Sequence, residues 1–142
     1  MYKTIVVPID LSDALSSRLT LPVALNFVNA FGAKLHLINI IPDVGISMLE
    51  EYLPKQWMNN QKSHHVLQLD QLVEQYVPMD IKVQKFIGRG HVYDEIINYA
   101  NSVNADLFIV PSIRPELQDY MLGTNVSKIV RHAKISVLVV RE

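Results

Sequence analysis

The sequence predicts an α/β protein in which five parallel strands form one sheet with helices on both faces, and two observations lead to this fold class. Short apolar runs rich in Val and Ile alternate along the chain with longer segments of helical periodicity, and strands joined through helices run parallel. Most of these runs are apolar on both faces, as expected of strands that are covered on each side. We expect a flavodoxin-like strand order of 3-2-1-4-5.

The chain has 142 residues, of which 49% are hydrophobic. This suffices for one well-buried core, so we expect a single domain over residues 1–142. The net charge of -1 argues against general attraction to nucleic acid or to an anionic membrane. The chain has no cysteine, and Met1 does not begin a signal-peptide pattern. We therefore expect a cytoplasmic protein with neither nucleic acid nor membrane among its partners.

The first strand is expected over Lys3 to Ile9, a β-branched run that is apolar on both faces. A helix is expected from Ala14 to Phe31. Ser12 or Asp13 offers a side-chain oxygen to the N–H groups of its first turn, and Gly32 suits the left-handed position that ends a helix.

This first helix contains an interior proline, Pro22, which removes one hydrogen bond and clashes with the preceding turn. We expect a kink there or two shorter helical pieces. Apolar residues at steps of three and four predict its inward face, and these residues are Leu15, Leu19, Val23, Phe27 and Ala30.

The middle of the chain predicts two strands around a long helix. Lys34 to Ile41 reads as a second buried strand, and Ile81 to Ile87 as a third, more exposed strand with alternating apolar residues. Between them, residues 44–60 form an irregular stretch that leads into a helix over about Gln56 to Tyr76. Its expected inward face consists of Val66, Leu69, Leu72, Val73 and Tyr76.

The third strand is expected to end in a tight turn at Gly88-Arg89-Gly90, whose glycines are too close together for a nucleotide-binding fingerprint. A helix over His91 to Val103 follows. The fourth strand is expected over Asp106 to Val110 and the fifth over Ser136 to Val140, both rich in β-branched residues.

The segment between the last two strands is the first candidate for a ligand site. A helix opens at Gly123-Thr124-Asn125, where backbone N–H groups and the helix dipole can receive a phosphate. In the expected strand order, Asp10 faces the segment from Pro111 to Asn125 across one crevice. An ordinary helix start would explain the same Gly-Thr-Asn sequence, and Asp10 could equally support the start of the first helix.

Other kinds of chemistry have weaker support. The sequence contains no Gly-Lys-Ser/Thr of a P-loop. His64 and His65 are adjacent and point to different faces of a helix, so we expect no metal site. No histidine is spaced to activate Ser112 as a nucleophile, so we expect no catalytic residue. A phosphate-receiver domain needs a cluster of carboxylates at its strand ends, and the third strand ends instead in glycine.

Three separated motifs resemble the universal stress protein family, and the resemblance covers nearly the whole chain. Pro8-Ile9-Asp10 is similar to the opening Pro-x-Asp of the family, Gly88 precedes a helix, and Gly123-Thr124 begins the closing block. That block continues with Ile129 to Ala133 and Val137 to Val140, and it is the more specific signal.

The resemblance implies a Rossmann-like homodimer that pairs through Ser136 to Val140 and binds ATP, or ADP or AMP, with or without magnesium beside the phosphates. The nucleotide would lie between the first and fourth strands. Asp10 would meet the adenosine, Ile40 would line the adenine pocket, and the Gly-Thr-Asn helix start would hold phosphates. The full implied set is Pro8, Ile9, Asp10, Ile40, Pro111, Ser112, Arg114, Gly123, Thr124 and Asn125.

The implied phosphate loop departs from the pattern of the nucleotide-binding members. Pro111 and Arg114 occupy the positions of two glycines, and the loop to Gly123 is one residue shorter. Loss of two glycines weakens a cradle of backbone amides, whereas the guanidinium of Arg114 offers several donors to phosphate. The Ser-x-Arg-Pro loop looks like that of the short-loop, single-domain bacterial members, in which nucleotide binding is retained.

We therefore expect an adenine-nucleotide-binding regulatory protein of the stress response and not a dedicated enzyme. Two alternatives stay open. The chain could be a member of the family that has lost nucleotide and acts through its dimer and partner surfaces. It could also hydrolyse nucleotide slowly, with turnover that depends on Asp10.

Overall fold

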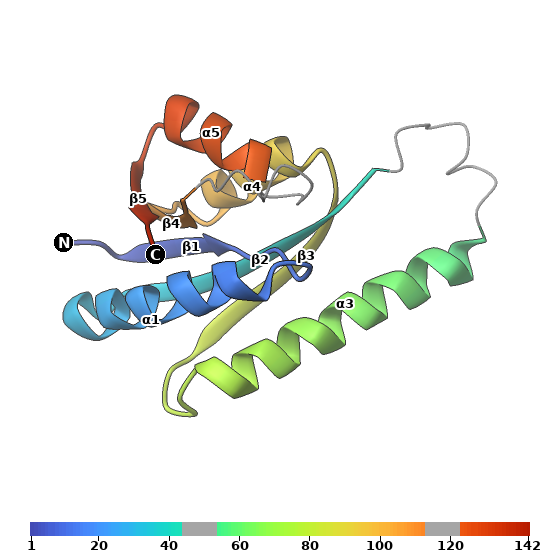
Figure 1. Cartoon of the computed structure of the whole chain (residues 1–142), viewed down its shortest axis with the longest axis horizontal. Coiled ribbons are helices and arrows are strands. Elements are labelled where there is room, and N and C mark those ends of the chain that lie inside the picture. Colours follow the sequence, from blue (N-terminus) through green and yellow to red (C-terminus); the bar gives the residue numbers. More distant parts are fainter. Residues whose placement is uncertain (44–53, 113–122) are drawn as a thin grey trace.

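The computed structural model describes residues 1–43, 54–112 and 123–142 (Figure 1). Residues 113–122 of the predicted phosphate loop, Arg114 among them, and most of the irregular stretch over 44–60 lie outside these ranges. The elements follow one another as β1 (Thr4–Pro8), α1 (Ala14–Phe31), β2 (Lys34–Pro42), α3 (Lys55–Tyr76), β3 (Val83–Gly90), α4 (Val92–Ser102), β4 (Leu107–Pro111), α5 (Gly123–His132) and β5 (Ser136–Val140).

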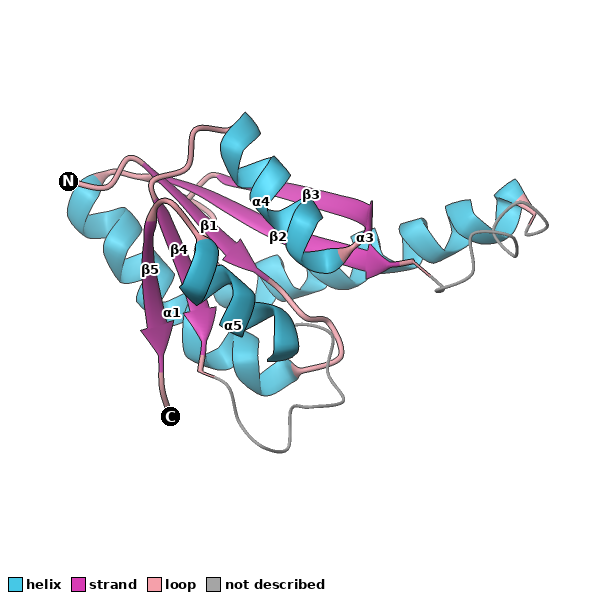
Figure 2. Ribbon diagram, turned by 90° about the horizontal axis from the view of Figure 1, so that it is seen from above, coloured by secondary structure: helices cyan, strands magenta, loops and turns pink. Residues whose placement is uncertain are grey.

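The five strands form one parallel sheet in the order β3-β2-β1-β4-β5, which confirms the predicted fold class and strand order. Helices α1 and α3 cover one face and α4 and α5 cover the other (Figure 2). Each face has its own apolar core. Leu21 and Leu69 are buried on the first face, and Ile96 and Ile129 on the second.

Strands β1 and β4 pair near their amino ends and not near their carboxyl ends. β1 pairs with β2 along Thr4–Pro8, but with β4 at Ile5 and Val6 only. β4 continues to pair with β5 as far as Pro111. The connections after β1 and β4 lead to helices on opposite faces of the sheet, which is the condition for a ligand site in open α/β sheets.

Helix α1 begins and ends at the predicted residues. Asp13 caps it by accepting a hydrogen bond from the Ser16 N–H at 3.4 Å, and Gly32 closes it with φ of 64°. The helix runs through Pro22 without interruption, so the expected division into two pieces is wrong. Pro22 and Arg18 are both exposed, so the Arg18 carbonyl, which lacks its helical donor, lies on the side that water reaches.

The buried face of α1 is rotated from the predicted one. Of the predicted residues, Ala30 is exposed and the other four are only partly buried. Small side chains fill the buried face because their hydroxyls bond within the helix: Ser16 donates to the Asp13 carbonyl at 2.9 Å and Thr20 to the Ser16 carbonyl at 3.0 Å. Apolar periodicity does not register hydroxyl side chains, and so it misplaces a buried face that consists of Ser16, Ser17, Thr20, Leu21 and Ala24.

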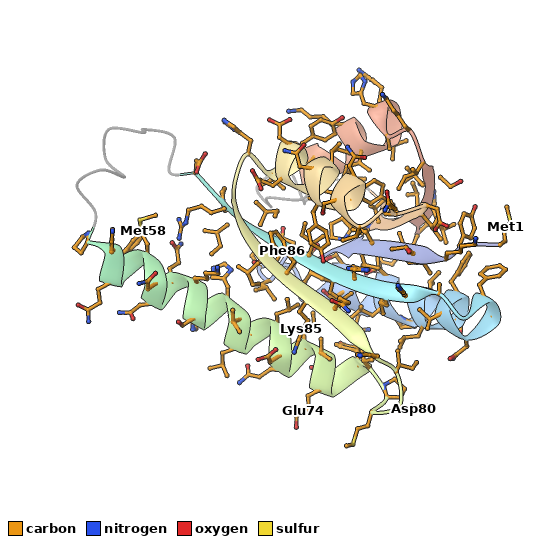
Figure 3. The ribbon with its side chains drawn as sticks, turned by 180° about the vertical axis from the view of Figure 1, so that it is seen from behind. Met1, Met58, Glu74, Asp80, Lys85 and Phe86 are labelled. Atoms are coloured by element: carbon orange, nitrogen blue, oxygen red, sulfur yellow. The ribbon has the colours of Figure 1, made fainter. Side chains whose placement is uncertain are left out.

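Helix α3 contributes to the apolar core through its carboxyl-terminal half, while its amino-terminal end projects past the strands (Figure 1). The predicted inward residues that contact the core are Leu69, Leu72, Val73 and Tyr76. Val66 is 40% exposed, so its assignment to the inward face is wrong. Lys85 of β3 lies toward α3 (Figure 3) and forms an ion pair with Asp70 at 2.5 Å.

Strand β3 continues beyond its predicted end. Gly88-Arg89-Gly90 belongs to the strand and pairs with Ile40 to Pro42 of β2, so the predicted tight turn is wrong. β2 is nine residues long, and its backbone offers partners along this whole segment, which outweighs the turn preference of glycine. Arg89 donates from Nη2 to Oε1 of Gln61 on α3 at 2.8 Å, so its guanidinium is not directed only at solvent.

Candidate functional site

Asp10 stands directly after β1, at the carboxyl edge of the sheet, and its side chain is 3% exposed. Its Oδ1 accepts hydrogen bonds from the backbone N–H of Ser12 at 2.9 Å and from the Ser12 hydroxyl. The Asp10 carbonyl accepts from the N–H of Asp13, the cap of α1, at 3.1 Å. Asp10 therefore orders the turn between β1 and α1. This agrees with the expectation that Asp10 could support the start of the first helix.

The same aspartate also lines a small pocket with a cavity volume of about 10 Å³, which is room for about one water molecule. Its walls come from the ends of β1 and β2 and from the first turns of α4. The lining residues are Pro8, Ile9, Asp10, Ile38, Asn39, Ile40, Val92 and Ile96. The pocket is mostly apolar, and its polar residues are Asp10 and Asn39. The Asn39 side chain itself is directed to the α3 face of the sheet, where it bonds to His65.

Four of the predicted site residues, Pro8, Ile9, Asp10 and Ile40, thus meet in one pocket. The other four lining residues were not predicted. The sequence could have indicated Val92 and Ile96 as lining residues, because both belong to the apolar side of the helix that follows the third strand at the same edge of the sheet. Asn39 stands inside an apolar strand sequence, and no pattern in the chain distinguishes it as a site residue.

A second hollow of about 480 Å³ adjoins this pocket, and Val92 lines both. Predicted residues Thr124 and Asn125, at the start of α5, lie on one side of it, together with Lys128 one turn later. The other side consists of the end of β2 and the start of α4, including His91. A helix start and a lysine are suited to an anion, whereas Asp43 and Asp94, which line the same hollow, oppose one.

The remaining predicted residues lie apart from the pocket or outside the described ranges. Pro111 is buried and pairs with Val140 of β5. The Ser112 N–H donates to the Val140 carbonyl at 2.8 Å, and Ser112 lines a different hollow, between α5 and β5. Gly123 is buried at the start of α5 and lines none of these hollows. Arg114 falls in the part of the chain that is not described.

An aromatic cluster supports the pocket from the α4 side of the sheet. His36 of β2 is 6% exposed, and its Nδ1 lies 2.9 Å from the hydroxyl of Tyr99 on α4. The Tyr99 ring stacks on Phe86 of β3 with centroids 4.5 Å apart. Burial, with a smaller contribution from the charge of Lys34, lowers the pKa of His36 below 6.5, and burial raises the pKa of Tyr99.

The part of the chain that the structure describes contains no group of three His, Cys, Asp or Glu side chains placed to hold a metal ion. Within the same residues, no helix combines the length and the apolar character needed to cross a bilayer. The pocket therefore offers a mainly apolar surface with one carboxylate, and the neighbouring hollow offers a helix start and a lysine together with two further carboxylates, Asp43 and Asp94.

The strand order and the pocket beside β1 define a Rossmann-like α/β protein with a pocket at the switch point of its sheet. Residues 1–141 match the universal stress protein family, and the chain belongs to that family. A curated relative, "Universal stress protein G" of Escherichia coli O157:H7, is 27% identical, and the alignment covers 99% of this chain and 100% of the relative.

Solved structures of the family have the same fold. Universal stress protein UspA from Lactobacillus plantarum has a TM-score of 0.78 at 22% identity, over 99% of this chain and 98% of that one. A universal stress protein solved in complex with cAMP has a TM-score of 0.67 at 21% identity, over 98% of this chain and 96% of that one. At these identities the likeness concerns the fold.

Proposed function

We propose that this chain is a single-domain, homodimeric and cytoplasmic universal stress protein that binds an adenine nucleotide, ATP or else ADP or AMP, and acts as a regulatory protein of the stress response. It is not a dedicated enzyme, and neither nucleic acid nor membrane is among its partners. The observation that carries the proposal is the pocket beside β1, in which Asp10 and Ile40 line one mainly apolar space next to Thr124 and Asn125.

Each part of the pocket suits a different part of the nucleotide. The apolar side chains of Ile40, Val92 and Ile96 match the faces of an adenine ring. A carboxylate such as Asp10 can accept hydrogen bonds from ribose hydroxyls. The phosphates would lie at Gly123, Thr124 and Asn125, where the helix start supplies N–H donors. A universal stress protein of the same fold has been solved in complex with cAMP.

Lys128 adds an element that the family resemblance did not suggest. It lines the same hollow as Thr124 and Asn125, so its ammonium group is available to the phosphates there. A mobile point charge of this kind can compensate in part for the lost glycines at Pro111 and Arg114. In this proposal Pro8 completes the site beside Asp10, and magnesium accompanies the phosphates if it is present. Pro111, Ser112 and Arg114 would join the site from the connection between β4 and α5, although Ser112 lines a separate hollow in this structure.

A second copy of the chain is the proposed partner of β5. Edge strand β3 carries two charged residues, Lys85 and Arg89, and charges on an edge strand protect it against pairing. Edge strand β5, Ser136–Val140, has none and consists largely of Val and Leu. The hollow beside it is lined by Val130, which is 50% exposed, and by Val139, with the charged residues Arg131 and Arg141 outside the strand. An uncharged apolar edge of this kind suits a homodimer.

One observation favours the alternative of a protein that binds no nucleotide. Pro111 replaces a glycine of the binding pattern, and it is buried and committed to the ladder with β5. Its ring has no N–H to offer to a phosphate. In that case the dimer and its partner surfaces alone would carry the function.

Mass spectrometry of small molecules released from the protein as purified distinguishes the two. We expect ATP, ADP or AMP at about one per chain. Titration with ATP, with and without magnesium, then tests whether the helix start binds the phosphates. Gly123→Val should abolish ATP binding, because a side chain would obstruct the helix start. If the purified protein contains no nucleotide and also fails to bind added ATP, the alternative holds, in which the protein acts only through its dimer and partner surfaces.

A further inference from the structure

The backbone of Ile9 leaves the sheet immediately before Asp10, and two bonds to β2 hold it there. The Ile9 N–H donates to the Ile38 carbonyl at 2.7 Å. The Ile9 carbonyl accepts from Nδ2 of Asn39 at 2.9 Å, so a side chain takes the place of a backbone partner. Asn39 is 1% exposed, and this bond lies at the point where β1 no longer pairs with β4.

The Asn39 amide is held from its other end by His65 of α3. Because the Ile9 carbonyl can only accept, the NH₂ group of Asn39 must face it and the amide oxygen must face away. That oxygen lies 2.9 Å from Nδ1 of His65, so the imidazole donates from Nδ1. Burial, then the charges of His64 and Arg89, lower the pKa of His65 below 6.5, which favours the neutral ring.

The chain of bonds from His65 through Asn39 to Ile9 differs from the other polar links of α3. Gln61 bonds to Arg89, and Asp70 pairs with Lys85, and both partners belong to edge strand β3. Neither Arg89 nor Lys85 lines the pocket beside β1, whereas Asn39 does. Among these three links, the one through Asn39 therefore connects α3 with the pocket.

We propose that Asn39 and His65 are positioning residues of the nucleotide site: together they hold the Ile9 carbonyl, fix where Asp10 leaves β1, and make nucleotide affinity depend on the docking of α3. The proposal rests on the proposed function for the identity of the ligand. The mechanism itself is local. Without the Asn39 donor, a buried carbonyl loses its partner, and the turn at Asp10 shifts to let water reach it.

The test compares variants that each remove one polar link of α3. His65→Leu breaks the link to Asn39, and Gln61→Leu, one turn earlier on the same helix, is the matched control. His65→Asn should restore the link, because the Asn amide nitrogen can occupy the place of Nδ1. Asn39→Ala removes the donor to Ile9 itself. Thermal unfolding of each variant monitors the fold.

Two readouts are measured. Calorimetric titration with adenosine and with ATP should show that His65→Leu weakens both by the same factor of about three to ten, and Asn39→Ala by about tenfold or more. We expect the same factor for adenosine and for ATP because Asn39 and His65 act at the end of the site that binds the nucleoside. His65→Asn should bind nearly as the wild type does. In the unliganded protein, the ¹H–¹⁵N resonances of Ile9 and Asp10 should move in His65→Leu and stay in place in Gln61→Leu.

Equal losses of affinity in His65→Leu and Gln61→Leu, or resonances of Ile9 and Asp10 that do not move in His65→Leu, would overturn the positioning role. A wild-type protein that binds neither adenosine nor ATP would overturn the proposed function instead. The resonances of the unliganded variants would then still decide whether the pair positions Asp10.

Discussion

At the scale of single residues, the side chains around the pocket combine a structural task with a place in the lining. Asp10 orders the turn before α1 through Ser12 and also lines the pocket. Asn39 holds the Ile9 carbonyl and lines the same pocket. Substitutions there change stability and binding together, so a useful experiment keeps the hydrogen bonds and removes one property at a time.

Asp10→Asn keeps an oxygen that can accept from the Ser12 N–H and removes the charge. We expect ATP affinity to fall about ten- to hundredfold, as for a lost charge-assisted hydrogen bond, with little change in thermal unfolding. Asp13→Asn is the matched control, because it removes a buried charge from the cap of α1, where asparagine caps equally well. Calorimetric titration of both variants measures the effect. Equal ATP affinities of Asp10→Asn and Asp13→Asn would show that Asp10 does not contact the nucleotide.

His36 predicts how stability depends on pH. Its pKa in the folded protein lies below the unfolded value of 6.5, so the unfolded chain binds the proton more readily. The contribution of His36 is complete above pH 6.5 and is lost progressively as the pH falls below 6.5 towards the folded pKa. His36→Gln should reduce the slope of the free energy of unfolding between pH 7 and 5, measured by urea denaturation. A slope identical to that of the wild type would contradict this.

At the scale of elements, the register between β2 and β3 shapes the pocket. Gly88 pairs with Ile40, the predicted adenine-lining residue. A Cβ at Gly88 would lie 2.9 Å from Cδ1 of Ile40 and 2.9 Å from Cε1 of Phe86, closer than side chains tolerate. The extension of β3 past its predicted end therefore places a residue without a side chain behind the wall of the pocket.

Gly88→Ala should push Ile40 towards the pocket. Crowding of this kind costs about 1 to 2 kcal/mol, and we expect adenosine to bind about five- to thirtyfold more weakly. Gly32→Ala serves as the control, because it strains the left-handed end of α1 by about 1 kcal/mol with open space around the new Cβ. Binding and thermal unfolding are measured for both, and equal affinities would contradict the role of Gly88.

At the scale of the whole molecule, the two edges of the sheet differ in how well they are protected against pairing with another strand. β3 has lysine and arginine side chains and is partly covered by α3, whereas β5 is apolar and has an exposed valine beside it. A homodimer through β5 would bury that edge. The β3 edge and the projecting amino-terminal end of α3 would then face away from the dimer interface (Figure 1). The crevice beside β1 would stay accessible in such an arrangement.

Val139→Lys tests the dimer, because two-fold symmetry would bring the new charge and its copy to one interface. We expect the dissociation constant of the dimer to rise at least about tenfold, measured by sedimentation. Gln84→Lys adds the same charge to the opposite edge strand and should leave the association unchanged. A wild-type chain that sediments as a monomer at high concentration would contradict the assignment of β5.

The order of elements was predictable because alternating apolar runs and helical segments are properties of consecutive residues. Gly32 at the end of α1 and the bounds of β5 follow from residue types alone, whereas residue types left the cap of α1 open between Ser12 and Asp13. The side of each helix that meets the sheet was less predictable. Ser16 and Thr20 are buried because their hydroxyls bond within α1, a property that hydrophobic periodicity does not register.

The sequence by itself determined the fold class, the strand order and the family to which the chain belongs, because these depend on patterns along the chain and on motifs of neighbouring residues. Only the tertiary structure decided which side chains share a pocket, that Gly88 lies behind Ile40, and that His65 reaches Ile9 through Asn39. The physical reason is that hydrogen bonds and packing between α3, β2 and β1 join residues whose separation along the chain carries no repeating pattern.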